Sequence, residues 1–529
     1  MTMVKLTING QETEVPAGTT ILEAARKMGI YIPVLCHHPD LAPAKGSRGA
    51  AAIYQGETRI ENTRPGEGAE ECGLCLVEIQ GQPDLAAACS TEVRPGLVVM
   101  TDNPRINAKR QENLVPILAR HPHACLTCAE QEGCSRTQCS SNVALNERCC
   151  TLFGRCELQA VSKYVGIPPQ TPRWISTGLP VLDKDPLFTR NYNLCIGCTR
   201  CVRACRELRG VEAIGFVYDD KGAIQVGSLA PGLGESGCRY CTACVEVCPT
   251  GALMDKSLRP GKKAEDLVPC KEACPAHIDI PAYLRLVAEG RNDEANAVIR
   301  EKVAFPGVLG RVCIHPCEQV CRRGEVNQPV SICSLKRYAA DGDQGLWKRR
   351  GKCVAASTGK KVAVIGAGPA GLTAAFHLRK AGHAVMLFES RAKAGGMMRY
   401  AIPRYRLPEE VLDREIRDIL DTGIDFKPFH TLGREFTLEQ LRKKGFDAVF
   451  LAVGAQLSRR ISLEGSELPD VLWGLDFLRQ VAEGNPVKLK DRVIVVGGGS
   501  VAVDVALTVM RCGAKKVEMA CLEKREEMP

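Results

Sequence analysis

The chain has 529 residues, enough for several domains, and 28 of them are cysteines. No apolar run reaches the roughly 20 residues that span a bilayer, and the net charge of +9 is small for this length. No zinc-finger spacing or basic–aromatic interleaving indicates a nucleic-acid partner. The N-terminus shows no leader pattern, so we expect a cytoplasmic protein. In a reducing compartment, clustered cysteines predict metal or redox sites rather than disulfides.

The first predicted domain, residues 1–100, opens with two short strands around an Asn9-Gly10 turn, which is typical of a hairpin. A short helix follows Thr20, with Glu23 at capping-box spacing. This domain then contains Cys36, Cys72, Cys75 and Cys89. It resembles the [2Fe–2S] ferredoxin module of β-grasp fold that opens the complex I large iron–sulfur subunit. The resemblance implies that these cysteines bind a [2Fe–2S] cluster, with structural thiols as the alternative. The insertion at 45–71, unusually long for that family, lacks cysteine, so it can loop out without removing a ligand.

The second predicted domain, residues 101–165, has an H-x3-C-x2-C-x5-C pattern made by His121, Cys125, Cys128 and Cys134. Complex I large subunits, iron-only hydrogenases and some formate dehydrogenases have this pattern directly after the [2Fe–2S] module. The resemblance implies one [4Fe–4S] cluster, whose neutral imidazole ligand shifts its potential. A Cys3His zinc site is the alternative. Four further cysteines match no family pattern and either bind another cluster or remain buried or reactive thiols: Cys139, Cys149, Cys150 and Cys156.

A proline-rich linker at 166–185 precedes a predicted two-cluster [4Fe–4S] ferredoxin at 186–260. Two C-x2-C-x2-C-x3-C runs occur there, a spacing typical of bacterial two-cluster ferredoxins. In such ferredoxins the fourth cysteine of each run serves the other cluster. One predicted ligand set is therefore Cys195, Cys198, Cys201 and Cys248. The other is Cys238, Cys241, Cys244 and Cys205.

Residues 261–355 are predicted to be a helical iron–sulfur domain, because apolar residues recur at a spacing of three to four. From residue 268 onward the chain resembles the small subunit of bacterial glutamate synthase and the N-terminal part of dihydropyrimidine dehydrogenase. That family carries two [4Fe–4S] clusters here, but an upstream C-x2-C pair is missing. The candidate ligands are Cys270, Cys274, Cys313, Cys317, Cys321 and Cys333. We predict one cluster on Cys274, Cys313, Cys317 and either Cys321 or Cys333, with an atypically ligated second cluster left open.

Residues 356–490 are predicted to be an incomplete FAD-binding domain of Rossmann-like fold. The strand–turn–helix motif G-x-G-x-x-G contains Gly366, Gly368 and Gly371, and Glu389 follows the next strand. These glycines allow a tight turn, close approach of pyrophosphate and close helix packing, and the acid accepts from ribose. The family resemblance implies that the group is FAD. It also implies flavin-side contacts from the following motif at Gly395, Gly396 and Arg399.

Residues 491–529 repeat the motif at Gly497, Gly499 and Ala502, and the resemblance implies a nicotinamide nucleotide. NADPH-using family members often have arginine pairs where this chain has Leu522 and Glu523. A carboxylate there favours NAD(H), although Lys524 and Arg525 keep NADP(H) open. Only the first β–α–β unit of this domain precedes Pro529. We therefore expect the sequence to be an N-terminal fragment of a longer protein.

Together these segments predict a multidomain α+β and α/β chain that is an FAD-dependent NAD(P)H oxidoreductase. It would carry a [2Fe–2S] cluster and at least four [4Fe–4S] clusters, which suggests a low-oxygen setting. Flavin converts a two-electron hydride into single electrons, so no catalytic side chain is required. From chain order, electrons would pass from the helical-domain cluster through the ferredoxin pair and the His121 cluster to the [2Fe–2S] centre. The expected partner is a ferredoxin or a formate dehydrogenase, hydrogenase or diaphorase subunit. The alternatives are a non-catalytic electron-transfer subunit and, less in keeping with the N-terminal half, a role like that of glutamate synthase.

Overall fold

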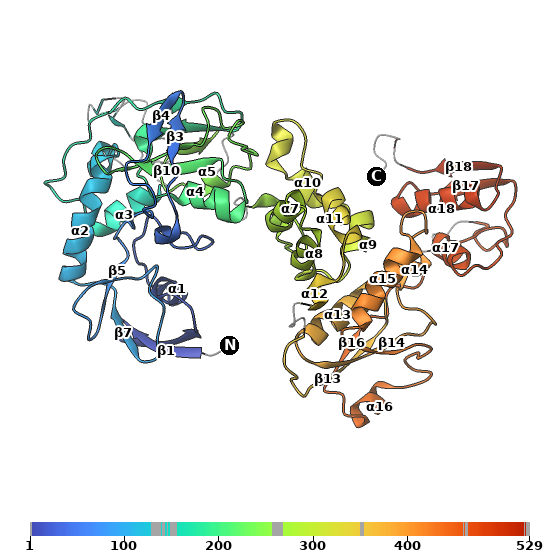
Figure 1. The fold of residues 1–529 in the computed structure, drawn as a ribbon. Helices are drawn as coiled ribbons and strands as arrows, with labels where there is room; N and C mark the ends of the chain where they lie inside the picture. Colours follow the sequence, from blue (N-terminus) through green and yellow to red (C-terminus); the bar gives the residue numbers. More distant parts are fainter. Residues whose placement is uncertain are drawn as a thin grey trace. The chain divides into compact units, whose positions relative to one another are not determined.

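A computed structural model describes residues 3–128, 139, 143–144, 147–148, 156–256, 268–349, 354–458, 460, 464–522 and 524. The chain forms two compact units. The first unit comprises Met1–Ala273 with Gln319–Val330, and the second comprises Cys274–Glu318 with Ser331–Pro529. In Figure 1 the first unit is mainly blue to green and the second mainly yellow to red.

The N-terminal sheet of the first unit has the strand order β2-β1-β7-β5-β6. Its strands are β1 (Met3–Ile8), β2 (Gln11–Pro16), β5 (Leu76–Ile79), β6 (Ala86–Ala87) and β7 (Leu97–Met100). β1 and β2 form the predicted hairpin, and both Asn9 and Gly10 adopt the positive φ that its turn requires. α1 (Ile21–Lys27) shares an apolar core with this sheet. Thr20 and Glu23 form the predicted capping box at the start of α1.

The insertion between Cys36 and Cys72 leaves the two cysteines in contact, with the N–H of Cys72 3.4 Å from Sγ of Cys36, but it is not a bare loop. It contributes two strands to a sheet of order β10-β11-β3-β4. These strands are β3 (Ala52–Gln55), β4 (Thr58–Glu61), β10 (Ile214–Tyr218) and β11 (Ile224–Ser228). β3 pairs antiparallel with β11 through Tyr54 and Ser228, and Ile53 and Gln55 are buried on one face. The alternation of buried residues along β3 is the ordinary signal of a half-buried strand.

The first unit also contains helices and short strands, several of which are labelled in Figure 1. They include α2 (Pro104–Ala119), α3 (Glu157–Val165), β8 (Val181–Leu182), β9 (Phe188–Asn191), α4 (Arg200–Arg203), α5 (Ala243–Glu246), β12 (Leu253–Asp255) and α6 (Pro269–Glu272). Leu114 and Leu118 of α2 pack with Leu158 and Val161 of α3 in one core. β8 falls inside the predicted linker and pairs with β9 in the sheet β12-β9-β8.

The second unit begins with short helices, as the apolar spacing of this segment predicts. They are α7 (Ile280–Ala288), α8 (Asn292–Arg300), α9 (Pro306–Val312), α10 (Pro316–Gln319), α11 (Ile332–Asp341) and α12 (Leu346–Arg349). Phe305 and Trp347 of this segment share a core with Leu372 and Phe376 of the α/β region that follows. The buried carboxylate of Glu415 accepts hydrogen bonds from two N–H groups at the start of α9. The helices and the α/β region are therefore packed as one body.

The α/β region has a parallel sheet of order β15-β14-β13-β16. Its elements are β13 (Lys361–Ile365), α13 (Pro369–Lys380), β14 (Ala384–Phe388), α14 (Met397–Tyr400), α15 (Glu409–Leu420), β15 (Asp425–Lys427), α16 (Leu438–Lys443) and β16 (Ala448–Leu451). Val362 and Val364 of β13 are buried among Leu372 and Phe376 of α13. This packing places the carboxyl end of β13 and the start of α13 at one edge of the sheet.

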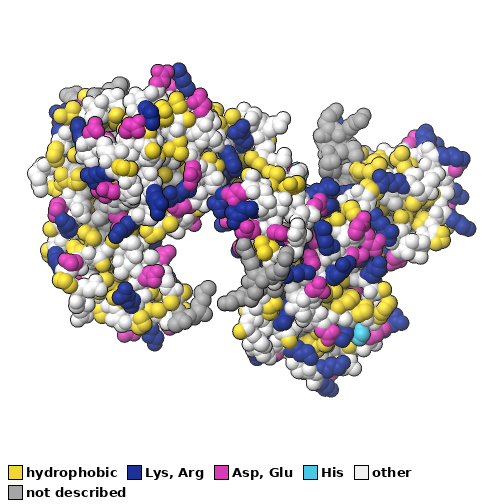
Figure 2. Space-filling view, in the orientation of Figure 1, with side chains coloured by type: hydrophobic (Ala, Val, Ile, Leu, Met, Phe, Trp, Pro, Cys, Tyr) yellow, Lys and Arg dark blue, Asp and Glu magenta, His cyan; other side chains and the backbone are white. Residues whose placement is uncertain are grey.

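A second parallel pair, β17 (Arg492–Val496) and β18 (Lys516–Ala520), follows α17 (Gly474–Ala482) and encloses α18 (Ser500–Arg511) in sequence. Large apolar side chains are exposed here, including Ile494, Val496, Val501, Met510 and Met519. Figure 2 shows hydrophobic and basic side chains mixed on this part of the surface. Among the described residues, no helix is long and apolar enough to cross a membrane.

Candidate iron–sulfur and nucleotide sites

The cysteines predicted to bind the [2Fe–2S] cluster lie together in the first unit. The N–H of Cys72 donates to Sγ of Cys36 at 3.4 Å, and the Sγ atoms of Cys75 and Cys89 are 3.3 Å apart. Hydrogen bonding with Cys72 holds the pKa of Cys36 well below its usual range, and the same contact raises the pKa of Cys72. Thiolates this close repel one another, so they can all ionise together only when cations compensate their charge. This thiol set therefore fits the predicted cluster.

His121 lies two residues after the end of α2 and is 3% exposed. Its Nδ1 lies 2.9 Å from the carbonyl oxygen of Pro122, whereas its Nε2 has no hydrogen-bond partner among the described residues. An Nδ1–H that donates to a carbonyl leaves Nε2 as a neutral acceptor, the form that binds metals. Burial lowers the pKa of His121 to about 4, which favours this neutral form. The imidazole therefore has the chemistry of a cluster ligand.

The cysteines around His121 are only partly described. Cys125 lies in a 3₁₀ turn, Cys128 ends it, and both are half-buried. Cys134 lies outside the described residues, as do Cys149 and Cys150. Sγ of Cys139 accepts from the N–H of Val143 at 3.3 Å, and Sγ of Cys156 donates to the carbonyl of Pro249 at 3.4 Å. These later cysteines therefore keep both predicted alternatives, a further cluster or buried or reactive thiols.

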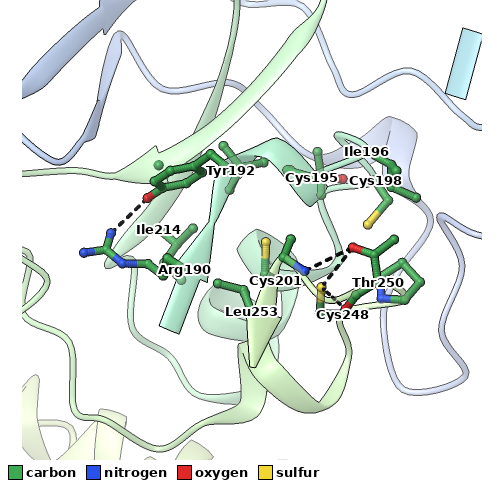
Figure 3. A pocket seen from close by; sticks show the side chains of 15 residues that line it. Arg190, Tyr192, Cys195, Ile196, Cys198, Cys201, Ile214, Cys248, Thr250 and Leu253 are labelled. Carbon is green, nitrogen blue, oxygen red and sulfur yellow. Dashed lines mark hydrogen bonds between the residues drawn. The ribbon is translucent and has the colours of Figure 1, made fainter. Parts of the chain in front are cut away.

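The first ferredoxin ligand set surrounds one pocket, shown in Figure 3. Its lining includes Cys195, Cys198, Cys201 and Cys248, together with apolar side chains such as Ile214 and Leu253. Burial raises the pKa of Cys201 well above its usual range, and the three other thiolates raise it further. Burial also raises the pKa of Cys198 to about 12. Cys248, from the second run, thus lies with three cysteines of the first run.

The second ferredoxin set shows the reciprocal exchange. Burial raises the pKa of Cys244, and the thiolates of Cys241, Cys238 and Cys205 raise it further. Cys205 belongs to the first run, and burial raises its pKa to about 12. Among the described residues, no three His, Cys, Asp or Glu side chains are grouped closely enough to hold a single metal ion. A cluster distributes its thiolates over several irons and does not require such a group.

The two ferredoxin runs repeat one backbone conformation. Gly197 and Tyr240 occupy equivalent positions and have φ of 71° and 52°. Thr199 and Thr242, two residues later, have φ of 56° and 61° and precede α4 and α5. Left-handed residues of this kind turn successive N–H groups toward one side, which suits an anionic group. The same backbone conformation, which suits an anionic group, therefore occurs in both cysteine runs.

The cysteines of the helical segment divide between the two units. Cys270 and Cys321 belong to the first unit, and the second unit contains Cys274, Cys313, Cys317 and Cys333. Burial and, to a smaller extent, the Cys274 thiolate raise the pKa of Cys317 to about 12. Burial raises the pKa of Cys333, which the Cys313 thiolate also raises. The sequence left Cys321 and Cys333 as alternatives for the fourth ligand. The structure groups Cys333 with Cys274, Cys313 and Cys317.

The first glycine-rich turn joins β13 to α13. Gly366 has a φ of 103°, and a Cβ there would lie 2.2 Å from the carbonyl oxygen of Ala452. A Cβ at Gly371 would lie 1.8 Å from the carbonyl oxygen of Gly366. At Gly368, by contrast, a Cβ would have its nearest neighbouring atom 3.8 Å away, so this position is open to a ligand. The three positions have the steric features of a pyrophosphate-binding turn.

Glu389 follows β14 directly and contacts the same turn. Its Oε2 accepts from the N–H of Ala367 at 2.9 Å, and its Oε1 accepts from the N–H of Arg391 at 3.0 Å. The side chain is therefore held at the end of the strand, beside the phosphate-binding turn. This is where an acid that recognises ribose hydroxyls belongs.

The motif after β14 approaches the first turn through its glycines. Gly396 has a φ of 50°, and a Cβ there would lie 2.7 Å from Cα of Gly368. Arg399 Nε donates to the carbonyl of Ala394 at 2.7 Å, and its Nη1 donates to Glu409 at 3.0 Å. Gly395, with φ of 134°, adopts a conformation that favours glycine. Arg399 thus holds this loop to α15, and its contact with flavin stays a prediction.

The second glycine-rich turn joins β17 to α18 and is sterically looser. Gly497 has a φ of 127°, and a Cβ there would meet only the Cβ of Ala502, at 3.5 Å. At Gly499, the residue before α18, a Cβ would meet nothing within 4 Å. Glu523 and Arg525 lie outside the described residues, so the preference for NAD(H) stays a prediction.

Sequence reasoning missed basic side chains that lie against the thiols. Nη1 of Arg209 is 4.0 Å from Sγ of Cys270, and the positive charge of Lys336 lowers the pKa of Cys317 and Cys333 against the effect of burial. Arg203 donates to backbone carbonyls beside two predicted clusters. The available signal was the run RCVRACRELR, in which arginines alternate with cluster cysteines.

Four family models match the chain in consecutive segments. Residues 1–104 match the 2Fe-2S iron–sulfur cluster binding domain, and residues 194–252 match the 4Fe-4S dicluster domain. Residues 264–345 match dihydropyrimidine dehydrogenase domain II with its 4Fe-4S cluster, and residues 360–527 match pyridine nucleotide-disulphide oxidoreductase. The chain joins iron–sulfur modules to a pyridine nucleotide oxidoreductase module. These matches confirm the predicted cluster types and imply FAD and NAD(P)H as the other cofactors.

Curated relatives resemble about half of the chain. The NADP(+)-dependent formate dehydrogenase subunit beta of Moorella thermoacetica is 41% identical over 285 residues, covering 49% of this chain and 40% of the relative. The NADPH-Fe(3+) oxidoreductase subunit beta of Geobacter sulfurreducens (strain DL-1 / KN400) is 40% identical over 269 residues, covering 49% and 39%. The NAD-dependent dihydropyrimidine dehydrogenase subunit PreT of Escherichia coli (strain K12) is 36% identical over 265 residues, covering 49% and 63%.

The chain therefore spans about two fifths of the length of the first two relatives. The small chain of bacterial glutamate synthase is also similar, at 36% identity over 256 residues for the Bacillus subtilis (strain 168) protein. These similarities confirm the resemblance stated from the sequence.

Proposed function

We propose that the protein is an iron–sulfur flavoprotein oxidoreductase that passes electrons between NAD(P)H, FAD and a series of clusters. The observation that carries this proposal is the presence, in one chain, of a pyrophosphate-binding turn and several buried thiol sets. FAD, when bound, would exchange hydride with the nicotinamide and single electrons with the clusters. The names of two relatives, a formate dehydrogenase subunit and an Fe(3+) oxidoreductase subunit, support this activity.

On the flavin side, the chain's own residues would bind and orient the cofactor. The start of α13 would supply N–H groups to the pyrophosphate, because the first N–H groups of a helix lack intrahelical partners. Gly368 leaves room for that approach, and Glu389 would accept from ribose hydroxyls. The turn at Gly497 and Gly499 would hold the nicotinamide nucleotide. Both nucleotide-binding regions would have the Rossmann-like form expected from the sequence.

On the cluster side, we propose the ligand sets that the structure brings together. The [2Fe–2S] centre would use Cys36 and the three cysteines near it, and the ferredoxin pair would use the crossed sets around Cys201 and Cys244. His121 would ligate a further [4Fe–4S] cluster through Nε2. In the helical domain we propose the set Cys274, Cys313, Cys317 and Cys333. The domain boundaries would follow these modules as predicted from the sequence.

The proposed partner is a redox protein that exchanges electrons with the cluster-rich unit, such as a ferredoxin or a formate dehydrogenase, hydrogenase or diaphorase subunit. The naming of one relative as a formate dehydrogenase subunit supports this class. We place the protein in the cytoplasm, where buried thiols stay reduced. NAD(H) remains the proposed nucleotide because of Glu523, and the ratio of kcat/KM for NADH and NADPH tests it.

The deciding experiment uses the full chain, purified without oxygen and assayed for iron and flavin. Addition of NADH or NADPH should bleach the flavin absorbance and then produce EPR signals of reduced clusters. Flavin that is bound but does not bleach would indicate instead a non-catalytic electron-transfer subunit. Absence of both flavin and iron from a folded chain would contradict the proposal.

A further inference from the structure

The insertion hairpin joins the predicted [2Fe–2S] module to the ferredoxin module within the first unit. The N–H of Ala50 donates to the carbonyl of Phe216 at 2.8 Å, and the N–H of Thr63 donates to the carbonyl of Tyr218 at 3.0 Å. The buried Gln55 amide donates to the carbonyl of Val226 at 3.0 Å. These bonds run along β3, β4, β10 and β11. The predicted [2Fe–2S] module and the ferredoxin module are therefore joined by a common sheet as well as by surface contacts.

The chain returning from this hairpin toward Cys72 is also held by the ferredoxin module. The hydroxyl of Tyr218 donates to the carbonyl of Gly68 at 2.7 Å and accepts from the N–H of Glu70 at 3.2 Å. The guanidinium of Arg64 lies over the same ring, 5.0 Å from its centroid. The segment that leads into the [2Fe–2S] ligands therefore has a fixed position on the ferredoxin module.

Arg203 connects the other end of this insertion to the ferredoxin module. It lies in α4, between Cys201 and Cys205, and its side chain is fully buried at 0% exposure. Its Nη1 donates to the carbonyl of Ala42 at 2.5 Å. Its Nη2 donates to the carbonyl of Cys36 and, at 3.4 Å, to the carbonyl of Cys198. One guanidinium thus contacts the backbone of a predicted [2Fe–2S] ligand and of a predicted ligand of the first cubane.

We propose that Arg203 is a positioning residue that, together with the insertion hairpin, fixes the [2Fe–2S] centre beside the first cubane of the ferredoxin pair, and that its charge sets the potential of both. The proposal rests on the cluster assignments given under the proposed function. Arginine stays charged in proteins, and its planar fork serves several acceptors at once. A buried positive charge stabilises the reduced, more negative state of any cluster near it. Its loss should lower both potentials.

The test compares three variants of the full chain, purified without oxygen, by EPR-monitored redox titration. Arg203→Gln removes the charge and should make the midpoints of the [2Fe–2S] centre and of one [4Fe–4S] cluster more negative. We expect about a tenfold change in each reduction equilibrium, which is about 59 mV for one electron. Arg203→Lys keeps the charge and should give smaller shifts. Spin relaxation of the [2Fe–2S] signal, which a nearby reduced cluster accelerates, should slow in Arg203→Gln.

Arg110 provides a matched control, because it is also 0% exposed and donates to two backbone carbonyls. Those carbonyls, of Leu76 at 2.8 Å and Thr101 at 2.9 Å, do not belong to the ferredoxin module. Arg110→Gln should therefore leave every [4Fe–4S] midpoint in place. The proposal is overturned if Arg203→Gln moves neither midpoint or only one, or if Arg110→Gln moves a [4Fe–4S] midpoint equally.

A second perturbation covers the case in which Arg203→Gln does not fold. A Cβ at Gly227 of β11 would lie 2.4 Å from the carbonyl oxygen of Tyr54, so Gly227→Ala should push the hairpin away without touching a cysteine. Gly232→Ala, where the nearest atom would be 3.4 Å away, is its control. Gly227→Ala should slow the spin relaxation of the [2Fe–2S] signal, and Gly232→Ala should not. Faster hydrogen exchange in β3 of Gly227→Ala would show that the hairpin has moved. Unchanged relaxation in that variant would then contradict the proposal. A wild-type chain without clusters would instead refute the proposed function.

Discussion

In the first unit the candidate binding groups are crowded thiols, whereas in the second unit the first glycine-rich turn is made of backbone. Sγ atoms of Cys75 and Cys89 are 3.3 Å apart, and burial raises the pKa of Cys201 and Cys244. At the turn, Gly366 and Gly371 leave no room for a side chain, and Glu389 already bonds to Ala367.

This difference indicates how each site depends on the group it binds. Buried neighbouring thiols are unfavourable as thiolates until metal compensates them, so cluster binding contributes directly to folding. The turn is already shaped by strand and helix packing, so a nucleotide meets a site that exists without it.

Removal of iron should have the largest effect. Anaerobic chelation should make residues 188–256 of the first unit sensitive to protease, because the thiols lose the cations that compensate them. The α/β region around β13 and α13 should stay resistant and keep its flavin. Limited proteolysis with mass spectrometry, read beside flavin fluorescence, measures both. Loss of flavin at the same chelator concentration would show that the two regions do not differ in this way.

Gly371→Ala should weaken FAD binding by roughly ten- to a hundredfold. The added methyl would lie 1.8 Å from the carbonyl oxygen of Gly366, and overpacking of this kind costs about 1–3 kcal/mol. Gly499→Ala is the matched control in the second turn, where the methyl meets nothing within 4 Å. It should retain full flavin content, measured by absorbance after gel filtration. Equal flavin loss in both variants would contradict the steric distinction between the two turns.

Cys333→Ser should remove one cubane, about four irons per chain, because Cys333 interacts with Cys313, which in turn lies near Cys317. Cys321→Ser, a change of the same chemistry in the first unit, should keep that cluster. Iron analysis and Mössbauer spectra of the two variants give the answer. The opposite result, with iron lost only from Cys321→Ser, would show that Cys321 and not Cys333 is the fourth ligand.

His121→Cys should have the smallest effect on composition. The cluster should remain bound, and its potential should fall because a thiolate donates more charge than a neutral imidazole. His123→Gln serves as a control, since His123 Nδ1 lies 2.9 Å from the carbonyl oxygen of Leu118 and the residue is outside the ligand pattern. EPR titration of both variants measures the shift. An unchanged potential in His121→Cys would exclude His121 as a ligand.

Local features of the fold follow from short stretches of sequence. Asn9-Gly10 forms the predicted turn, and Thr20 with Glu23 forms the predicted capping box. The cysteine runs come together in the crossed arrangement that their spacing indicates. Each of these depends on residues within a few positions of one another, or on a motif whose geometry is specific, so pattern alone was sufficient.

Longer-range features required the tertiary structure. The sequence shows that the insertion at 45–71 can loop out without removing a ligand, and only its pairing with β11 through Tyr54 and Ser228 shows that it belongs to the ferredoxin sheet. The spacing also left Cys321 and Cys333 as alternatives beside Cys313, and it gave no sign that Arg203 lies between Cys36 and Cys198. The spacing of residues in the sequence indicates the local conformation of the backbone. Strand pairing and the position of buried charges depend instead on which distant segments pack together.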